Sequence, residues 1–300
     1  MPLMPSIHTF DEGHLESLSS CPWCDSTAAH RLFEEKGYPY DECASCGLIF
    51  LSTRLRRDAV RELYDSTTYN ASRDLRFERR RAEKQLAMVL PLPPGARVFE
   101  HGAGIGCFVS VCRQAGLEAA GCDLGQSSVE DAKRLNGVDL VLGDLDAVPL
   151  APGSLDLFVS FNVLSHLYEP WRYFERIERL LKPGGRLFLR TGDRTGRMRR
   201  VRWGDWSAPQ HVFHYHRELL RSMMKRAGLN VTKIAPAFDS DYPYFLYDFS
   251  RDTSTAVRRV AGRVCSYTIL AWTLLGLPKD DVYIVGERRS AAEWADREET

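Results

Sequence analysis

The stretch EHGAGIG, residues 100–106, decides the fold, because its glycines stand where a strand turns into a helix. It ends an apolar run at 96–100, which predicts a strand, and it opens a helical pattern at 105–115. Glycines remove the Cβ atoms where a ligand must approach the backbone, and the following helix N-terminus offers free N–H groups. The spacing G-x-G-x-G differs from the dinucleotide fingerprint, since residue 107 is Cys. The acid before the glycines can accept from a ligand ammonium group and would repel a pyrophosphate.

The alternation of short apolar runs and helical patterns continues outward from this turn. Further strands are predicted at 117–122, 138–142, 155–161, 186–191, 230–235 and 282–287. Helical patterns lie between most of them, at 105–115, 126–135, 169–181 and 216–227. Strands that alternate with helices imply right-handed crossovers and a mainly parallel sheet covered on both faces. We therefore expect an α/β protein with a doubly wound sheet of seven strands.

Two more acids follow the next predicted strands. Asp123 comes about 20 residues after the glycine turn, where a carboxylate can bind both hydroxyls of a ribose. Asp144 ends the third strand, where a carboxylate can accept from an adenine amino group. Each acid alone is more often a helix cap or a solvated turn residue. Together with Glu100, they predict a nucleotide-type cofactor in the crevice at the carboxyl edge of the sheet.

Four of the eight cysteines form two C-x-x-C pairs near the N-terminus, CPWC at 21–24 and CASC at 43–46. The gap between the pairs lets a hairpin bring them to opposite sides of one ion. We expect a structural zinc site with no open coordination position, whose binding free energy folds a segment too small for its own core. The predicted ligands are Cys21, Cys24, Cys43 and Cys46. Two buried or redox-active cysteine pairs are the alternative.

Composition narrows the class of protein. The chain has 300 residues, of which 44% are hydrophobic, so it can bury a sizeable core. Equal counts of basic and acidic residues, 40 each, argue against a polybasic protein that wraps nucleic acid. The N-terminus does not resemble a secretory signal, and the most apolar stretch, 267–277, is shorter than the ~20 residues of a membrane helix. We expect a cytoplasmic protein without a membrane span.

The motifs resemble those of class I S-adenosylmethionine-dependent methyltransferases over about residues 75–289. The resemblance rests on EHGAGIG, GCDLG, GDLDAVPL, SLDLFVSFNVLSHLYEP and LLKPGG, with the KPGG turn at 182–185 as a distinctive part. CPWC…CASCGLIFL, followed by LYDSTTY, resembles the zinc-binding front of a bacterial group that includes deoxysugar C-methyltransferases. HVFHYHRELLRSMMKRAGLNV resembles the substrate-side helix of small-molecule members of that group. The resemblance implies a Rossmann-like sheet whose last strand is antiparallel, preceded by a small zinc ribbon.

The resemblance also implies S-adenosylmethionine as the cofactor. Glu100 and the glycines would hold its methionine and ribose portions, with Asp123 on the ribose and Asp144 on the adenine. His101 stands where the family commonly has an apolar residue. The implied cofactor-binding residues are Glu100, Gly102, Gly104, Gly106, Asp123, Leu124, Asp144, Leu145, Phe161 and Asn162.

Transfer of a methyl group requires alignment of the acceptor, exclusion of water and, for many acceptors, removal of a proton. A neutral histidine is suited to the last task near pH 7. We favour His211 as the base, with His214 and Tyr215 as alternates, because they precede the helix at 216–227 on a loop expected to cross the acceptor cavity. His166 lies near the expected cofactor mouth, which such a histidine commonly frames in the family. For His166 a packing role is favoured over catalysis, and the alternative for the other three is a role as loop or N-cap residues.

Seven arginines and a single acid lie between Arg186 and Arg202. Guanidinium groups match the oxygens of phosphates and carboxylates, so the cluster indicates an anionic acceptor that is phosphorylated, nucleotide-linked or carrier-bound. A solvated basic loop is the alternative.

We divide the chain into a zinc-binding module at 1–52, a helical linker or lid at 53–94, a methyltransferase domain at 95–289 and a tail at 290–300. A helical insertion at 250–277 is expected to cover the acceptor site or to form a homodimer contact. The predicted function is an S-adenosylmethionine-dependent methyltransferase for a small, anionic metabolite in biosynthesis. The rivals are an RNA methyltransferase, whose zinc ribbon and arginines grip phosphates, and a non-catalytic partner protein that keeps the fold.

Overall fold

The structure is a computed structural model that describes residues 8, 10–60, 74–195, 206–237 and 281–289. The predicted insertion at 250–277 and the predicted tail at 290–300 lie outside these residues. Within the described ranges, no helix is both long enough and apolar enough to cross a bilayer.

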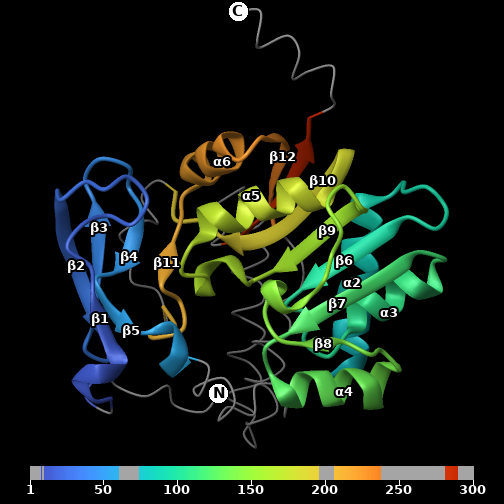
Figure 1. Cartoon of the computed structure of the whole chain (residues 1–300), viewed down its shortest axis with the longest axis horizontal. Coiled ribbons are helices and arrows are strands. Elements are labelled where there is room, and N and C mark those ends of the chain that lie inside the picture. Colours follow the sequence, from blue (N-terminus) through green and yellow to red (C-terminus); the bar gives the residue numbers. More distant parts are fainter. Residues whose placement is uncertain (1–7, 9, 61–73, 196–205, 238–280, 290–300) are drawn as a thin grey trace, which may run out of the picture.

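A seven-stranded sheet forms the centre of the larger part of the molecule (Figure 1). Its strands are β6 (Arg97–His101), β7 (Glu118–Asp123), β8 (Val141–Leu142), β9 (Leu155–Phe161), β10 (Leu181–Gly192), β12 (Leu229–Pro236) and β13 (Asp281–Arg288). Their order in space is β12-β13-β10-β9-β6-β7-β8. The strands from β10 to β8 are parallel, and β13 is antiparallel to both of its neighbours. The predicted α/β sheet with an antiparallel last strand is confirmed.

Helices cover both faces of this sheet. They are α2 (Leu75–Val89), α3 (Cys107–Gln114), α4 (Gln126–Asn136), α5 (Pro170–Leu180) and α6 (Arg217–Arg226). Successive residues of β6 point to opposite faces, so Val98 packs in the core under α2, α3 and α4, and Phe99 in the core under α5 and α6. Short 3-10 helices η2, η3 and η4 span Glu12–His14, Leu145–Ala147 and Leu164–His166. The carboxyl ends of the parallel strands are therefore left open between the two helical layers.

Two predicted elements differ from the structure. The run at 138–142 predicts a full strand, but only its last two residues pair with β7, because Gly137 and Val138 close helix α4 with a bond from the Val138 N–H to the Ala132 carbonyl. The predicted helical linker at 53–94 does not begin as a helix, because residues 53–55 form a strand. Helix α2 begins at Leu75, since the Asp74 side chain accepts the Arg76 and Phe77 N–H groups.

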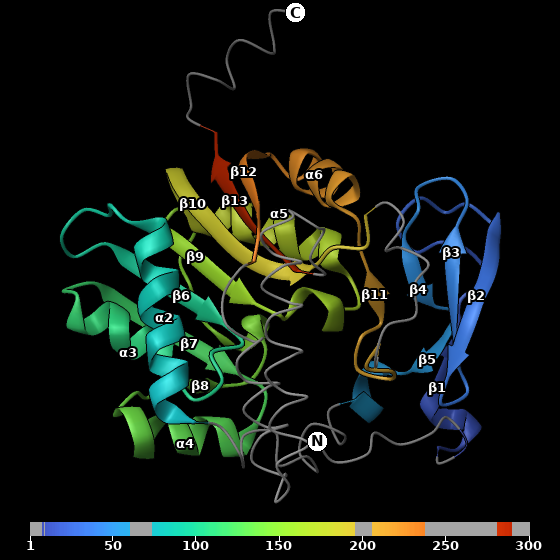
Figure 2. The same cartoon turned by 180° about the vertical axis from the view of Figure 1, so that it is seen from behind.

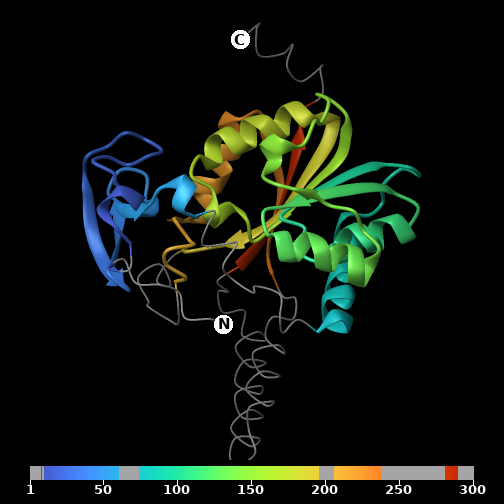
Figure 3. The same cartoon turned by 60° about the horizontal axis from the view of Figure 1, so that its bottom comes forward.

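The front module, defined here as residues 10–55, lies beside the sheet (Figures 2 and 3). It contains β1 (Leu15–Ser17), β2 (Ala29–Glu35), β3 (Tyr38–Cys43), β4 (Ile49–Leu51) and β5 (Thr53–Leu55). Strand β5 pairs with β1, whereas β2, β3 and β4 form a sheet in the order β11-β4-β3-β2. The added strand β11 (Phe213–His214) comes from the distant segment before α6. Residues of the methyltransferase-like half thus complete the front sheet, and the division of the chain at residue 52 stays a prediction.

Candidate active site

A cavity of about 440 Å³ lies at the carboxyl ends of β6, β7 and β9. Its walls come from the turn after β6, the loops that follow β7, β8 and β9, and one side of α2. The predicted cofactor residues that line it are Glu100, Gly102, Gly104, Asp123, Leu124, Asp144, Phe161 and Asn162. Gly106 and Leu145 do not line it: Gly106 caps helix α3, and Leu145 is buried at the start of η3. Most of the predicted cofactor residues are thus brought together.

The turn after β6 requires glycine for its conformation and its packing. Gly102 has a φ of +73°, and a Cβ there would lie 2.3 Å from the Val163 side chain. Gly104 and Gly106 also have positive φ angles, of 53° and 72°. The N–H groups of Gly102 and Ala103 both donate to the Cys122 carbonyl, which ties the turn to β7. The backbone therefore forms a bare wall of the cavity.

Glu100 is a buried acid at the end of β6, with 4% of its surface exposed. Among the described residues, its Oε2 atom has no hydrogen-bond partner. Burial, and then the negative charge of Asp123, raise the pKa of Glu100 well above its ordinary value, although Arg81 opposes the shift. A buried acceptor without a donor is costly, and the residue that carries this one lines the cavity. The site therefore fits a ligand that brings a cationic N–H donor to Glu100.

The other two acids are held in place by hydrogen bonds. Asp123 accepts the Gly125 N–H at 2.9 Å and the Gly104 N–H at 2.7 Å, one on each oxygen. Asp144 accepts the Leu145 N–H at 2.7 Å. Carboxylates whose position is set by backbone donors keep further lone pairs for a ligand.

His101, the residue that departs from the family pattern, contacts the Asp144 carboxyl group with its ring. Its Nε2 atom lies 3.0 Å from an Asp144 oxygen, and its Nδ1 atom lies 2.8 Å from the Tyr173 hydroxyl. The hydrogen bond from His101 lowers the pKa of Asp144. Sequence reasoning missed this contact. A histidine inside a buried strand, one residue after an acid of the same edge, was the available signal.

Two of the four predicted catalytic residues lie side by side next to the cavity. His166 lines it; His211 does not, but its ring meets the His166 ring edge-on with the ring centres 4.6 Å apart. The Nδ1 atom of His166 lies 3.1 Å from the Gln210 carbonyl, to which it donates. Burial lowers the pKa of His166 to about 4 and the pKa of His211 well below its ordinary value. Both rings are therefore neutral at pH 7.

His214 and Tyr215 lie behind this pair and do not line the cavity. The His214 ring packs 4.4 Å from Trp206 and 5.3 Å from Tyr40, between ring centres. The Tyr215 hydroxyl donates to the Leu164 carbonyl at 3.0 Å, and the side chain is buried. These contacts favour packing roles for both residues.

The arginine cluster is divided in space. Arg190 lines the cavity and donates to Asp281 at 2.6 Å. Arg186 donates to the carbonyls of Val89, the last residue of α2, and Pro91, and Arg194 lies over the Trp206 ring. Arg57, which sequence reasoning did not single out, also lines the cavity. The remaining members of the cluster, Arg197, Arg199, Arg200 and Arg202, lie outside the described residues.

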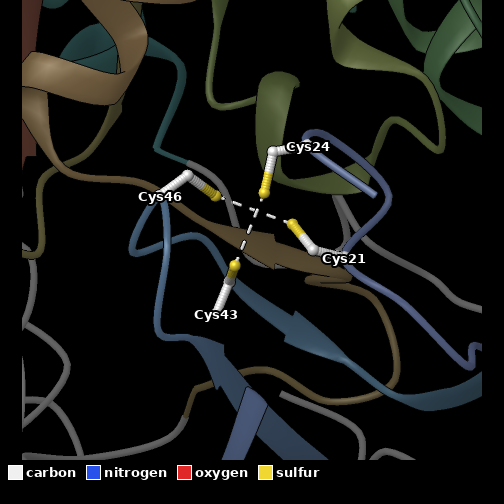
Figure 4. Close-up of side chains that lie close together, drawn as sticks. All are labelled: Cys21, Cys24, Cys43 and Cys46. Atoms are coloured by element: carbon white, nitrogen blue, oxygen red, sulfur yellow. Dashed lines mark hydrogen bonds between the residues drawn. The ribbon is translucent and has the colours of Figure 1, made fainter. Parts of the chain in front are cut away.

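The four predicted metal ligands converge in the front module (Figure 4). All four Sγ atoms lie within 4.8 Å of one another, and two pairs, Cys21–Cys46 and Cys24–Cys43, are 3.6 Å apart. Zn–S bonds of about 2.3 Å place neighbouring sulfurs of a tetrahedral site about 3.8 Å apart, so the cluster has the right dimensions for zinc. Asp25 and Gly47 supply the positive φ angle of each turn. The geometry supports the zinc prediction.

Comparison with known proteins identifies the family. A model of the methyltransferase domain matches residues 74–234, which is more than half of the chain. The chain belongs to the methyltransferase domain family. The match spans the glycine turn, all three acids and the His166–His211 pair, and it leaves the front module outside.

Relatives of this methyltransferase-domain protein include a demethylmenaquinone methyltransferase of Paenarthrobacter aurescens, 27% identical over 46% of this chain and 56% of its own. A ubiquinone biosynthesis O-methyltransferase of Xanthomonas campestris is 32% identical over 34% of this chain and 45% of its own. The chain spans about half the length of the curated relatives it matches. Phosphoethanolamine N-methyltransferase 2 of Haemonchus contortus has the same fold, with a TM-score of 0.56, 16% identity, and coverage of 87% of this chain and 71% of its own.

Proposed function

We propose that this protein transfers the methyl group of S-adenosylmethionine to a small anionic acceptor, with His211 as the base. One observation carries the cofactor assignment: Glu100 lines the cavity and has a buried Oε2 atom that is unpaired within the described ranges, and its carboxylate matches the ammonium group of the cofactor's methionine part. Relatives named for demethylmenaquinone and for ubiquinone biosynthesis support a small-molecule acceptor.

The residues at the sheet edge fit the whole cofactor. Gly102 and Gly104 would leave room for it against the backbone, Asp123 would hold its ribose hydroxyls, and Asp144 would accept from its adenine amino group. When bound, S-adenosylmethionine supplies an electrophilic methyl group on a sulfonium sulfur, which becomes a neutral thioether after transfer. The protein's own tasks are to orient the acceptor, exclude water and take up its proton.

His211 is the favoured base because its ring is neutral and packs against His166, which lines the cavity. Across the described segments, no side-chain hydrogen bond engages its ring nitrogens, whereas the edge of His166 limits its orientation. His166 lines the cavity, but backbone hydrogen bonds at Gln210 and at Asn162 engage its ring. Arg57 and Arg190 line the cavity and could bind an anionic group of the acceptor in addition to their carboxylate partners, Glu169 and Asp281.

Methyl-labelled S-adenosylmethionine, incubated with the protein and a nuclease-treated small-molecule extract, tests the proposal. We expect label in one small anionic product, detected by mass spectrometry, and little product from His211→Gln. His30→Gln, which changes an exposed histidine of the front module, is the matched control. A parallel reaction uses an extract that has not been treated with nuclease. Label that appears only in the RNA of that extract would contradict the small-molecule assignment. Absence of cofactor binding in calorimetry would overturn the cofactor assignment itself.

A further inference from the structure

The segment 206–212, called here the histidine loop, carries His211 and is held from two sides. On the side of the large sheet, the Val212 N–H donates to the Ser165 carbonyl at 2.8 Å. The His166 ring bonds to the Gln210 carbonyl at 3.1 Å. These contacts join the loop to η4, which lies beside the cavity. They hold its second half and leave residues 206–208 to other partners.

The front module holds the other side of the loop. Glu35, buried with 6% of its surface exposed, accepts the Trp206 N–H at 2.9 Å with one oxygen and the Ala208 N–H at 2.8 Å with the other. The Tyr40 hydroxyl donates to the His211 carbonyl at 2.9 Å. Two side chains of the front sheet therefore bind the backbone before the candidate base and at its own carbonyl.

The position of Glu35 is set by a tight hairpin. It ends β2, and the next two residues, Lys36 and Gly37, have positive φ angles of 54° and 84°, as a two-residue hairpin between twisted strands requires. The hairpin therefore determines where the Glu35 carboxyl group lies. A buried carboxyl group is stable only where donors meet it, and the donors here are supplied by the histidine loop.

We infer that Glu35 is a positioning residue for the methyl-transfer site, acting through the backbone of the histidine loop, with Tyr40 as its partner. The front module then has a function beyond binding a metal ion, because it completes the acceptor side of a site whose cofactor side it does not touch. In the described parts of the chain, no hydrogen bond or ion pair joins Glu35 to Glu100, Asp123 or Asp144. This inference rests on the proposed role of His211.

The test uses the full chain with Glu35→Ala, Glu35→Gln and Tyr40→Phe. The control is Asp41→Asn, which removes a carboxylate that pairs with Arg31 inside the front module and does not reach the loop. The first readout needs no acceptor: carbethoxylation of His211 by diethyl pyrocarbonate, followed by mass spectrometry with exposed His30 as internal reference. We expect His211 to react several-fold faster in Glu35→Ala, with Tyr40→Phe and Glu35→Gln intermediate and Asp41→Asn unchanged.

The second readout distinguishes an effect on the acceptor from an effect on the cofactor. Glu35→Ala should lower kcat/KM for the acceptor by about 100-fold, since displacement of a reacting group by ~1 Å has effects of that size. The Kd for S-adenosylmethionine should stay within about twofold, and Glu35→Gln, which keeps one acceptor oxygen, should recover part of the rate. Unchanged His211 reactivity in both Glu35→Ala and Tyr40→Phe would overturn the inference, as would an equal loss of cofactor affinity. If the wild-type protein transfers no methyl group, the proposed function fails, while the carbethoxylation result still decides whether Glu35 positions His211.

Discussion

Replacing Glu100 by Gln keeps the size of the side chain and removes its charge, and we expect opposite effects on stability and on cofactor binding. In the free protein, this carboxyl group is buried, and its Oε2 atom is unpaired within the described residues. The variant should therefore be more stable than the wild type at neutral pH. It should also bind S-adenosylmethionine more weakly, because the negative charge that faces the ligand's ammonium group is gone.

The pH dependence gives the stability difference a definite sign. Because burial raises the pKa of Glu100, the folded protein holds this proton more tightly than the unfolded chain. The contribution of the protonated Glu100 carboxyl group to the free energy of unfolding is fully present below pH ~4.5. It falls by at most ~1.4 kcal/mol per pH unit as the pH rises toward the raised pKa of the folded protein. The difference in unfolding free energy between Glu100→Gln and the wild type should thus grow with pH above 4.5 and then level off.

The binding effect follows from the strength of a hydrogen bond between charged groups. Such a bond contributes about 1.5–3 kcal/mol, so its loss should raise the Kd for S-adenosylmethionine by about 10- to 150-fold. Thermal unfolding between pH 4.5 and 8 and calorimetric titration measure the two effects. Glu118→Gln, an exposed glutamate at the start of β7, is the control and should change neither. A Glu100→Gln protein that is destabilised at pH 8 and binds the cofactor normally would refute the reasoning.

Three further outcomes are expected. Gly102→Ala should abolish cofactor binding and destabilise the protein by more than Gly95→Ala, because both residues have positive φ angles but only Gly102 has a neighbour, Val163, within reach of a new Cβ. Equal effects of the two variants in thermal unfolding would contradict this. His101→Phe should raise the Kd for the cofactor by about fivefold, since Asp144 loses a hydrogen bond of ~1 kcal/mol. An unchanged Kd in calorimetry would show that the Leu145 N–H alone holds Asp144 in place. Removal of zinc by a chelator, followed by elemental analysis, should lower the Tm and reduce acceptor turnover more than cofactor affinity, because the four cysteines hold the strands that support the histidine loop. A protein without bound metal, or one in which both properties fall together, would contradict this reading.

The sequence alone determined the features that depend on local chemistry. Only glycine adopts the angles of the turn at 100–106 without strain, so G-x-G-x-G predicts a bare backbone wall wherever it follows a strand. Parallel strands bring their carboxyl ends to one edge, so Asp123 and Asp144 were expected beside Glu100 before any contact was known. Likewise, two C-x-x-C pairs at this spacing predict one tetrahedral cluster.

Tertiary structure decided which distant residues meet around that edge. The strand pairing of 213–214 with β4, and the two bonds of Glu35 to the histidine loop, join positions more than 150 residues apart. The contact of His166 with His211 and that of His101 with Asp144 also depend on tertiary packing, although these residues are closer in the sequence. A histidine or a glutamate can form hydrogen bonds with many partners, and the residues next to it in the sequence do not predict which partner it has. Which partner it has depends on the packing of the two sheets, because burial leaves each polar group only the donors and acceptors that the fold brings within reach.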